Sequence, residues 1–504
     1  MTRRAGILLH PTSLPGRFAV GDIGPGAERF LEWAASAGQT LWQVLPLGPS
    51  GAGQSPYTTA SAFAGNPVLI SPERLVEDGL LAETDLEGAP PGGGEAADFD
   101  SAVPWKETLL RRAFDRFSRG GEAPGELTGA FDAFLAAPEQ ASWLPDWSLY
   151  AALKRDLGGR SWLDWEPDLS RRDPDALRLA AIALEEETRY HSFLQFLFFR
   201  QWDRVRARAR ELGVSILGDM PIYVAMDSAD VWSHPELFAL DEDRRPVEVS
   251  GVPPDYFSAT GQLWGNPLYD WPRMERDGFA WWIDRIGATL RTCDMLRIDH
   301  FRAFAAYWAV PARDETALNG RWRTGPGRRL FEAARRALGR LPIVAEDLGM
   351  ITQDVKDLLA SIEVPGMKVL QFAFYGDDSE YLPHNHAVRS AVYTGTHDND
   401  TARGWYGGLN DEERRRVWDY LGSDGSEVEW ALIRAAYGSV AETAIVPMQD
   451  ALGLGSEARM NTPAAPANAN WRWRARDDAF RGDVAERLRR MAALAGRLNL
   501  SSRA

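Results

Sequence analysis

Carboxylates follow several short apolar runs of this sequence, and one of them lies between basic residues. The stretch LRIDHFRAF (296–304) places Asp299 two residues after Arg297. If the run is a strand, its side chains alternate, so Arg297 and Asp299 lie on one face. An arginine there favours the ionised carboxylate and is expected to lower its pKa. The pair is either a structural ion pair or part of a reactive site.

Three further runs end in the same way. Asp219 closes VSILGD, Glu346 and Asp347 follow PIVA, and His397 and Asp398 close AVYTGTHD. A single acid at such a place is ordinary, because aspartate often caps a helix. Acids at four strand ends are harder to explain by structure alone, because like charges brought together repel one another.

Carboxylates in this number suit chemistry at a glycosidic bond, where one acid attacks the anomeric carbon and another protonates the leaving oxygen. Asp299, held ionised, suits the nucleophile. Glu346 has no basic neighbour in sequence, so burial would raise its pKa as a general acid/base requires. Asp398 would be a third acid that accepts hydrogen bonds from sugar hydroxyls, with His397 beside it. A Ca²⁺ or Mg²⁺ site is the rival use of such acids, but Arg297 disfavours a cation.

Eight apolar runs alternate with amphipathic segments, which predicts an α/β fold of the (β/α)₈ TIM-barrel type. The carboxyl ends of the strands would then bring the acids to one face. A doubly wound open sheet is the main alternative. The expected strands are 6–10, 40–47, 214–220, 294–299, 342–349, 367–374, 391–398 and 443–450, and helices are expected at 27–37, 193–213, 327–339 and 428–437.

Two gaps between the expected strands are too wide for a simple βα connection. They cover about residues 50–190 and 221–290. We therefore expect one catalytic barrel over residues 1–504, with insertion subdomains in the βα loops at these two places.

The composition limits the classes of binding partner and the cellular compartment that are expected. The formal net charge of −16 argues against nucleic acid and anionic membrane partners. The single cysteine, Cys293, leaves no internal disulfide and no cysteine metal cluster. No signal sequence or run of ~18 apolar residues is found, so a cytoplasmic protein is expected.

Longer motifs carry a resemblance to a known family. RIDHFRAF, VAEDLG and YTGTHDND resemble the catalytic motifs of the amylomaltases, which are 4-α-glucanotransferases (disproportionating enzymes) of the α-amylase clan. GILLHPTSLPG, SPYTTASAFAGNP, GDMPIYVAMDSADVW, PPDYFSATGQLWGNPLY and RMNTPAAPANANWRWR are similar to further segments of that family, in the family's order.

The resemblance implies a retaining transferase that acts on α-1,4-glucans such as maltooligosaccharides, amylose, starch or glycogen fragments. It implies Asp299 as nucleophile, Glu346 as acid/base and Asp398 as the carboxylate that stabilises the transition state. It further implies that Asp219, Arg297 and His397 contact the sugar or the nucleophile. The barrel is expected to lack the clan's C-terminal β-domain, and no cofactor or catalytic metal is implied.

Transfer in place of hydrolysis requires a bound acceptor hydroxyl that outcompetes water. Tyr256, Phe257 and Trp264 in an insertion loop, together with Ser55 and Tyr57, offer such a site, because flat aromatic rings bury the apolar face of a glucose ring. The alternative is that these aromatic residues form the core of their loops.

Two other segments bear on the ends of the glucan site. By resemblance, Asn461, Asn470 and Trp471 close over the donor side; the alternative is an ordinary C-terminal loop. At GPSGAGQSPY, Ala52 or a neighbour stands where a second tyrosine can occur in the family, which bears on a secondary glucan contact and on large cyclic products.

Two other functions use the same residues. An α-amylase-like hydrolase would use the three acids with water as acceptor. A non-catalytic glucan-binding or scaffold protein would keep the aromatic residues without needing all three acids, so their joint presence favours an enzyme.

Overall fold

The computed structural model describes residues 3–119, 125–254, 258–376, 379–463, 465 and 469–498. Tyr256 and Phe257, two of the expected glucan contacts, lie outside the described residues. Within the described part of the chain, no helix is both long and apolar enough to span a membrane.

Eight parallel strands form the central sheet, and their order in space follows their order in the chain. The backbone N–H of Ala345, the last residue of β9, donates to the carbonyl oxygen of Pro365, just before β10, at 2.9 Å. This bond joins the two strands at the ends of that order and closes the sheet into a barrel. The predicted (β/α)₈ barrel is therefore confirmed, and a doubly wound open sheet is excluded. The strands are β1 (Arg4–Leu8), β2 (Leu41–Gln43), β3 (Ser215–Met220), β6 (Met295–Ile298), β9 (Ile343–Ala345), β10 (Gly366–Val369), β11 (Ser390–Tyr393) and β12 (Thr443–Pro447).

Helices surround the barrel, and the sequence of the first helix shows why it forms and which face it buries. In α1 (Pro25–Ser36) a proline stands at the first turn, where its missing N–H costs nothing. Ala27, Phe30, Leu31 and Ala34 recur at helical spacing and are fully buried. The outer ring also contains α8 (Glu185–Glu211), α11 (Ala280–Thr292), α12 (Arg328–Leu338), α13 (Gln353–Ile362), α16 (Val428–Gly438) and α18 (Gly482–Leu494).

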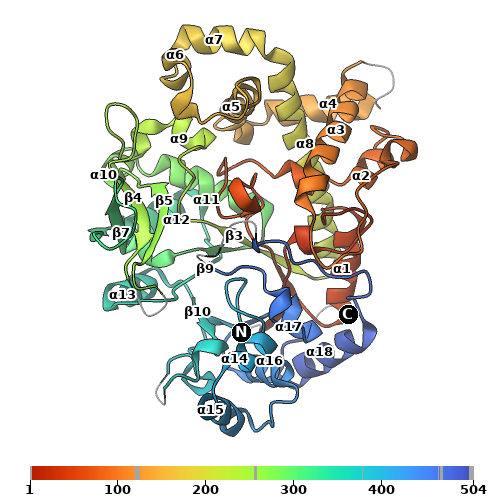
Figure 1. The fold of residues 1–504 in the computed structure, drawn as a ribbon, viewed down its shortest axis with the longest axis vertical. Coiled ribbons are helices and arrows are strands. Elements are labelled where there is room, and N and C mark those ends of the chain that lie inside the picture. The colour runs from red at the N-terminus through yellow and green to blue at the C-terminus, as the bar shows by residue number, and fades with distance from the viewer. Residues whose placement is uncertain are drawn as a thin grey trace.

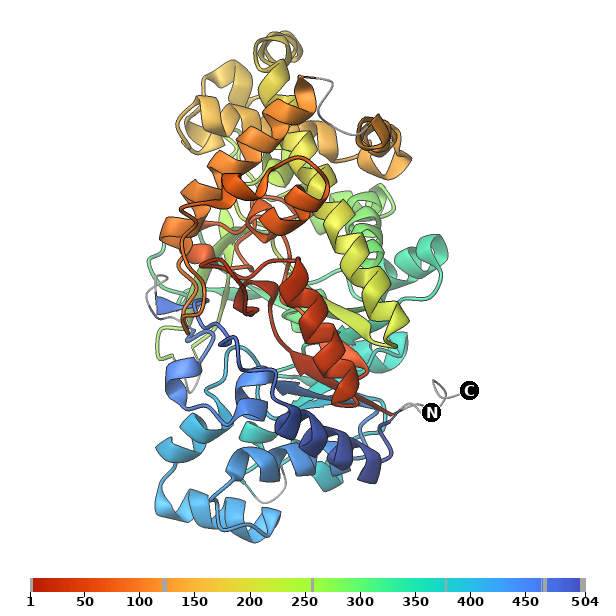
Figure 2. The same ribbon diagram turned by 90° about the vertical axis from the view of Figure 1, so that its right-hand side faces the viewer.

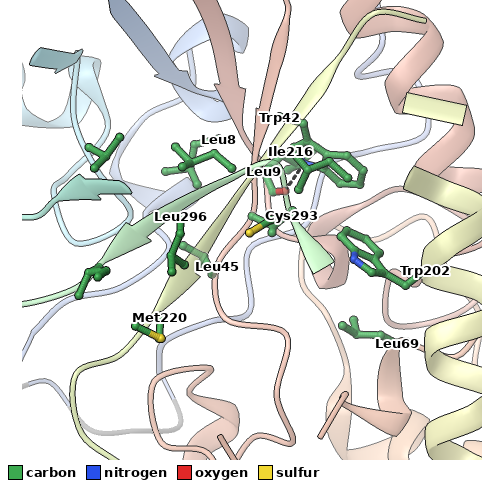
Figure 3. Packing of buried hydrophobic residues seen from close by; sticks show 14 of the residues in the cluster. Leu8, Leu9, Trp42, Leu45, Leu69, Trp202, Ile216, Met220, Cys293 and Leu296 are labelled. Carbon is green, nitrogen blue, oxygen red and sulfur yellow. Dashed lines mark hydrogen bonds between the residues drawn. The ribbon is translucent and has the colours of Figure 1, made fainter. Parts of the chain in front are cut away.

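Large side chains fill the space between the barrel and these helices (Figure 3). Trp42 on β2 and Trp202 on α8 are fully buried, with ring centroids 6.0 Å apart. The indole N–H of Trp42 donates to the carbonyl oxygen of Leu9 at 2.7 Å, as Figure 3 shows. Trp42 thus packs in the core while its indole N–H remains paired.

Helices fill most of the connection between β2 and β3. In Figure 1, α5, α6 and α7 lie at the top of the molecule, farthest from the helices that follow β11. Figure 2 shows α8 running back from this region to the barrel. The segment comprises α2 (Pro72–Glu77), α3 (Phe99–Ser118), α4 (Gly125–Ala136), α5 (Leu144–Asp156), α6 (Pro167–Ser170) and α7 (Pro174–Ala183).

A second, antiparallel sheet was not predicted from the sequence. Its order is β5-β4-β7-β8, and it is visible at the left of Figure 1. Two of its strands follow β6 and so lie outside the 221–290 segment, and the edge strand RWRT is exposed at every residue, so it lacks the usual alternation. The elements are α9 (Ala229–Ser233), β4 (Glu248–Val252), β5 (Gln262–Pro267), α10 (Trp271–Arg276), β7 (Ala306–Pro311) and β8 (Arg321–Thr324).

The last part of the chain is helical. Between β11 and β12 lie α14 (Ala402–Gly408), α15 (Asp411–Leu421) and α16, and α17 (Met448–Leu452) follows β12. The described residues after β12 contain no further strand.

Candidate active site

Arg297 on β6 joins two of the predicted acids. Its Nη1 atom donates to both carboxylate oxygens of Asp219, at 2.8 and 2.7 Å, and its Nη2 atom lies 2.9 Å from Oδ1 of Asp299. Asp219 and Arg297 are register partners on β3 and β6, and both side chains are almost fully buried. As the alternation of a strand predicts, Arg297 and Asp299 face the same way. The ion pair exists, and it extends to a second acid.

Backbone donors fix Glu346 at the end of β9. Its Oε2 atom accepts from the N–H of His300 at 2.7 Å, and its Oε1 atom accepts from the N–H of Leu348 at 2.8 Å. His300 has a left-handed backbone, with φ of 49°, which is uncommon for a residue with a side chain. The loop after β6 thus turns sharply beyond Asp299 and presents its N–H to Glu346. The two acids are neighbours.

The two neighbouring acids titrate together. Burial, and after it the negative charge of Asp299, raise the pKa of Glu346 to about 7. Burial also raises the pKa of Asp299 to about 6, although the Arg297 guanidinium opposes this. Arg297 lowers the pKa of Asp299, as the sequence predicts, but desolvation outweighs the ion pair and the net shift is upward. Near pH 6–7 the pair can share one proton, mainly on Glu346.

Asp398 has a different environment. Its Oδ2 atom lies 3.3 Å from Nε2 of His397, and its Oδ1 atom accepts from Nδ2 of Asn461 at 2.5 Å. Burial would raise the pKa of Asp398, but His397 and Asn461 outweigh it and hold this pKa below its usual range. The same contact raises the pKa of His397, against the effect of its burial. Asp398 therefore stays ionised, and its side chain keeps 44% exposure toward solvent.

Tyr57 brings the first insertion into the site. Its hydroxyl donates to Oδ2 of Asp219 at 2.6 Å, and its ring stacks on His397 with centroids 5.0 Å apart and planes 16° apart. Ser55 accepts from the backbone N–H of Tyr57 at 3.3 Å and so shapes the loop that carries the tyrosine. The structure brings Tyr57 to the acids, and Ser55 contacts its own loop.

Among the other predicted aromatic and amide side chains, some contact residues of the site and others contact only their own loop. Trp264 meets His300 edge to face, with centroids 4.7 Å apart, and keeps 38% exposure. Trp471 lies 5.8 Å from His397 between ring centroids. Asn470 exchanges hydrogen bonds with the backbone of Thr462, at 2.9 and 3.1 Å, so its amide closes the loop that carries Asn461.

Asp347 contacts the neighbouring strand. Its Oδ1 atom accepts from the N–H of Met367 at 2.6 Å, which ties the end of β9 to β10. His10 is buried, and burial together with the nearby His397 lowers its pKa to about 3. His10 is therefore neutral at the end of β1.

Two residues that position the site were not predicted from the sequence. Arg459 donates to the backbone carbonyl of Asp398 at 2.5 Å and to that of Asn461 at 2.8 Å. Asp450 accepts from the N–H of Ala402 at 2.7 Å and from the hydroxyl of Thr394 at 2.6 Å, which anchors both ends of the loop after β11. Their signals were a basic residue two places before Asn461 and an acid at the end of the eighth predicted strand.

The arrangement of side chains does not support the alternative of a Ca²⁺ or Mg²⁺ site. Within the described ranges, no group of three or more His, Cys, Asp or Glu side chains is placed to hold a metal ion. A guanidinium lies between Asp219 and Asp299, where a cation would have to bind.

A parallel barrel whose strand ends carry two neighbouring carboxyl groups and a third, ionised acid is an arrangement used by enzymes that act on glycosidic bonds. The family model described as 4-alpha-glucanotransferase matches residues 9–479, and the chain belongs to this family.

Relatives named as 4-alpha-glucanotransferases align with nearly the whole chain. The 4-alpha-glucanotransferase of Synechocystis sp. is 49% identical over 500 residues, 98% of each chain. That of Thermus thermophilus is 48% identical over 507 residues, 99% of this chain and 100% of the relative. Among solved structures, the amylomaltase from Streptococcus agalactiae in complex with acarbose aligns with a TM-score of 0.94 at 35% identity, over 99% of this chain and 100% of that one.

Proposed function

We propose that the protein is a retaining 4-α-glucanotransferase, which moves a segment of an α-1,4-glucan to the 4-hydroxyl of an acceptor glucan or glucose. The observation that carries this proposal is the coupled pair of Asp299 and Glu346, joined through the backbone of His300 in a chain of the 4-alpha-glucanotransferase family. Retaining chemistry needs one ionised and one protonated carboxyl group at the same bond, and this pair supplies both near neutral pH.

In the first half of the reaction, a carboxylate oxygen of Asp299 attacks the anomeric carbon of the donor. Glu346 gives its proton to the departing glycosidic oxygen, so that the shortened glucan leaves as a neutral alcohol. The product is a covalent glycosyl-enzyme, and we expect the two carboxyl groups to lie about 5–5.5 Å apart for this step.

In the second half, Glu346 takes the proton of the acceptor 4-hydroxyl, whose oxygen attacks the anomeric carbon and releases Asp299. When the acceptor is the other end of the same glucan, the product is cyclic. Two inversions at one carbon retain its configuration. The glucan itself is donor and acceptor, so this scheme calls for no cofactor.

The surrounding residues hold the sugar and the nucleophile. Arg297 orients Asp299, with Asp219 and Tyr57 fixing the other side of the guanidinium. Asp398 and His397 are placed to accept and donate hydrogen bonds at sugar hydroxyls, and the low pKa of Asp398 keeps it anionic beside a transition state with positive charge.

An acceptor must outcompete water at the glycosyl-enzyme. Trp264, exposed beside His300, offers an aromatic ring to the acceptor, and Tyr256 and Phe257 are proposed to extend this surface. Well-oriented partners reach effective molarities of roughly 10⁵ M or more, far above that of water. A hydroxyl held on such a surface therefore reacts first.

Asn461 contacts Asp398 on the donor side, and Asn470 and Ser55 are proposed to support the glucan by ordering their loops. We propose a single catalytic unit, in which the long segments between β2 and β3 and between β3 and β6 serve the barrel. A cytoplasmic location is proposed as well; the relative from Oryza sativa is described as chloroplastic/amyloplastic.

Incubation with maltotriose, followed by mass spectrometry and a reducing-end assay, tests the function. A transferase gives glucose and longer oligosaccharides while the number of reducing ends stays constant. A steady rise in reducing ends would instead identify an α-amylase-like hydrolase. Amylose as substrate shows in the same way whether cyclic products form.

A further inference from the structure

Aromatic side chains from three segments meet on the surface beside the strand ends. Tyr375 follows β10, Trp405 lies on α14, and Tyr420 lies on α15. Tyr375 is 58% exposed and Tyr420 38% exposed, while Trp405 is half-buried. These three residues are called the aromatic rim patch below. None of them takes part in the site around Asp299.

Contacts within the protein hold these rings in place. The buried Phe374 lies beneath them, with its ring centroid 5.9 Å from that of Trp405 and 5.9 Å from that of Tyr420. The indole N–H of Trp405 donates to the hydroxyl of Tyr375 at 3.3 Å, and the hydroxyl of Tyr420 pairs with Nδ1 of His384 at 2.8 Å. The surface is therefore formed before any ligand arrives, which reduces the entropy lost on binding.

The aromatic rim patch continues the rim of the active site. The loop that carries His397 and Asp398 leads directly into α14, where Trp405 lies. Gln371, four residues before Tyr375, donates to the backbone carbonyl of Asp400 at 2.8 Å. In Figure 1, α14 lies below the barrel strands with α15 and α16. A polymer that leaves the site on the side of β10 and β11 would meet these rings.

The chemistry of the patch fits a neutral sugar chain. Its three side chains carry no charge at neutral pH, which disfavours an ionic ligand, and each presents a flat ring with a polar atom at the edge. Such rings bury the apolar face of a glucose unit while hydroxyl and N–H groups meet its hydroxyl rim.

We propose that the aromatic rim patch is an additional binding site for a segment of an α-1,4-glucan, outside the catalytic centre. This proposal rests on the proposed function. A long glucan would contact the patch and the catalytic centre together, so the second contact would form at a high effective concentration. A short oligosaccharide held at Asp299 would gain nothing from it.

Steady-state kinetics with two substrates test the proposal. In the double variant Tyr375→Ser/Tyr420→Ala, KM for amylose should rise roughly fivefold to twentyfold, as expected for losing two aromatic contacts. The kcat/KM for maltotriose should stay at the wild-type value. An unchanged KM for amylose would overturn the proposal.

Trp418 provides a matched control. It is a 41% exposed aromatic residue on the same helix as Tyr420, but its indole lies near Gly425 and Tyr406 and not at Phe374. Trp418→Ala should leave the kinetics with amylose and with maltotriose unchanged. An equal rise in KM for amylose in this variant would show that the effect is not specific to the patch.

A binding measurement separates this proposal from the proposed function. In native gels that contain amylose, full-length Asp299→Asn protein should be retarded, and the same protein with Tyr375→Ser/Tyr420→Ala should be retarded less. Equal retardation would overturn the proposal even if the enzyme transfers glucans. Absence of transfer from maltotriose by the wild type would contradict the proposed function and leave this comparison valid.

Self-association is the other use of an exposed aromatic surface. Sedimentation equilibrium of the wild type and of the double variant should give the same molecular mass. If the substitutions change the mass and leave amylose binding unaltered, the patch is a contact between copies of the chain and the proposal is wrong.

Discussion

The backbone N–H of His300 holds the carboxylate of Glu346 at 2.7 Å, so the residue directly after Asp299 positions the second acid of the pair. This contact depends on the left-handed backbone of His300 and on no side-chain rotamer. The second oxygen of Glu346 is fixed in the same way by Leu348. Backbone donors of this kind set the geometry of a site more rigidly than flexible side chains.

Glu346→Gln and Asp299→Asn should each lower kcat/KM for maltotriose transfer by at least roughly 10²–10⁴, the range for losing a positioned acid or base. Glu346→Gln has a second effect, because an amide can accept from only one of the two backbone donors and turns its own N–H₂ toward the other. We therefore expect it to lower the thermal unfolding temperature more than Asp299→Asn does. Transfer near the wild-type rate in either variant would contradict the assigned roles.

The rate of transfer should depend on pH through the coupled pair. The reaction needs Asp299 ionised and Glu346 protonated, and the pair titrates with apparent pKa values of about 6 and about 7. The profile of kcat/KM for maltotriose should therefore rise through pH 6 and fall through pH 7, giving a narrow bell. A flat profile from pH 5 to pH 9 would disagree with the assignment.

Folding stability should respond to the same two groups. Both have folded-state pKa values raised above the ordinary carboxyl value of about 4, so the folded state binds more protons than the unfolded state between pH 4 and 7. Their contribution is fully present below about pH 4 and is lost as pH rises through 6 and 7.

Urea unfolding of the wild type and of Asp299→Asn/Glu346→Gln between pH 4 and 8 measures this contribution. The free energy of unfolding of the wild type should fall relative to that of the double variant as the pH rises. A difference that is constant with pH would show that the two acids are not desolvated in the folded protein.

Strand periodicity was enough to predict the barrel and the clustering of its acids. Each predicted strand exists, and the acids in or just after the last residues of β3, β6, β9 and β11 lie at the carboxyl ends where a barrel gathers them. The environment of these acids was beyond the sequence. The neighbouring Arg297 lowers the pKa of Asp299 as predicted, but the sequence does not show how completely a site excludes water, and burial determined the sign of the net shift.

Long-range pairing explains what else was missed. The second sheet joins strands from two separate segments, and its edge strand β8 is four exposed residues long, with no periodic signal. The hydrogen bonds between the amide of Asn470 and the backbone of Thr462 were likewise not predicted from the sequence. Arg459 acts on Asp398 across 61 residues of chain. Contacts of this kind follow from the fold and not from local pattern.

Arg297 offers the most direct test of how the site keeps Asp299 charged. Its guanidinium bridges Asp219, whose side chain is fully buried, and Asp299. Arg297→Met would leave Asp219 with the Tyr57 hydroxyl as its side-chain hydrogen-bond partner, and breaking a buried ion pair in this way costs about 3–5 kcal/mol of unfolding free energy. Arg297→Met/Asp219→Asn removes both charges, so much of that stability should return.

Activity should not return with it. In both variants Asp299 loses the cation that opposes its desolvation, so its pKa rises and the acidic limb of the pH–rate profile moves upward. Urea unfolding together with the pH dependence of kcat/KM separates the two effects. Recovery of transfer with an unshifted acidic limb in Arg297→Met/Asp219→Asn would mean that Arg297 supports the fold alone and leaves the nucleophile unaffected.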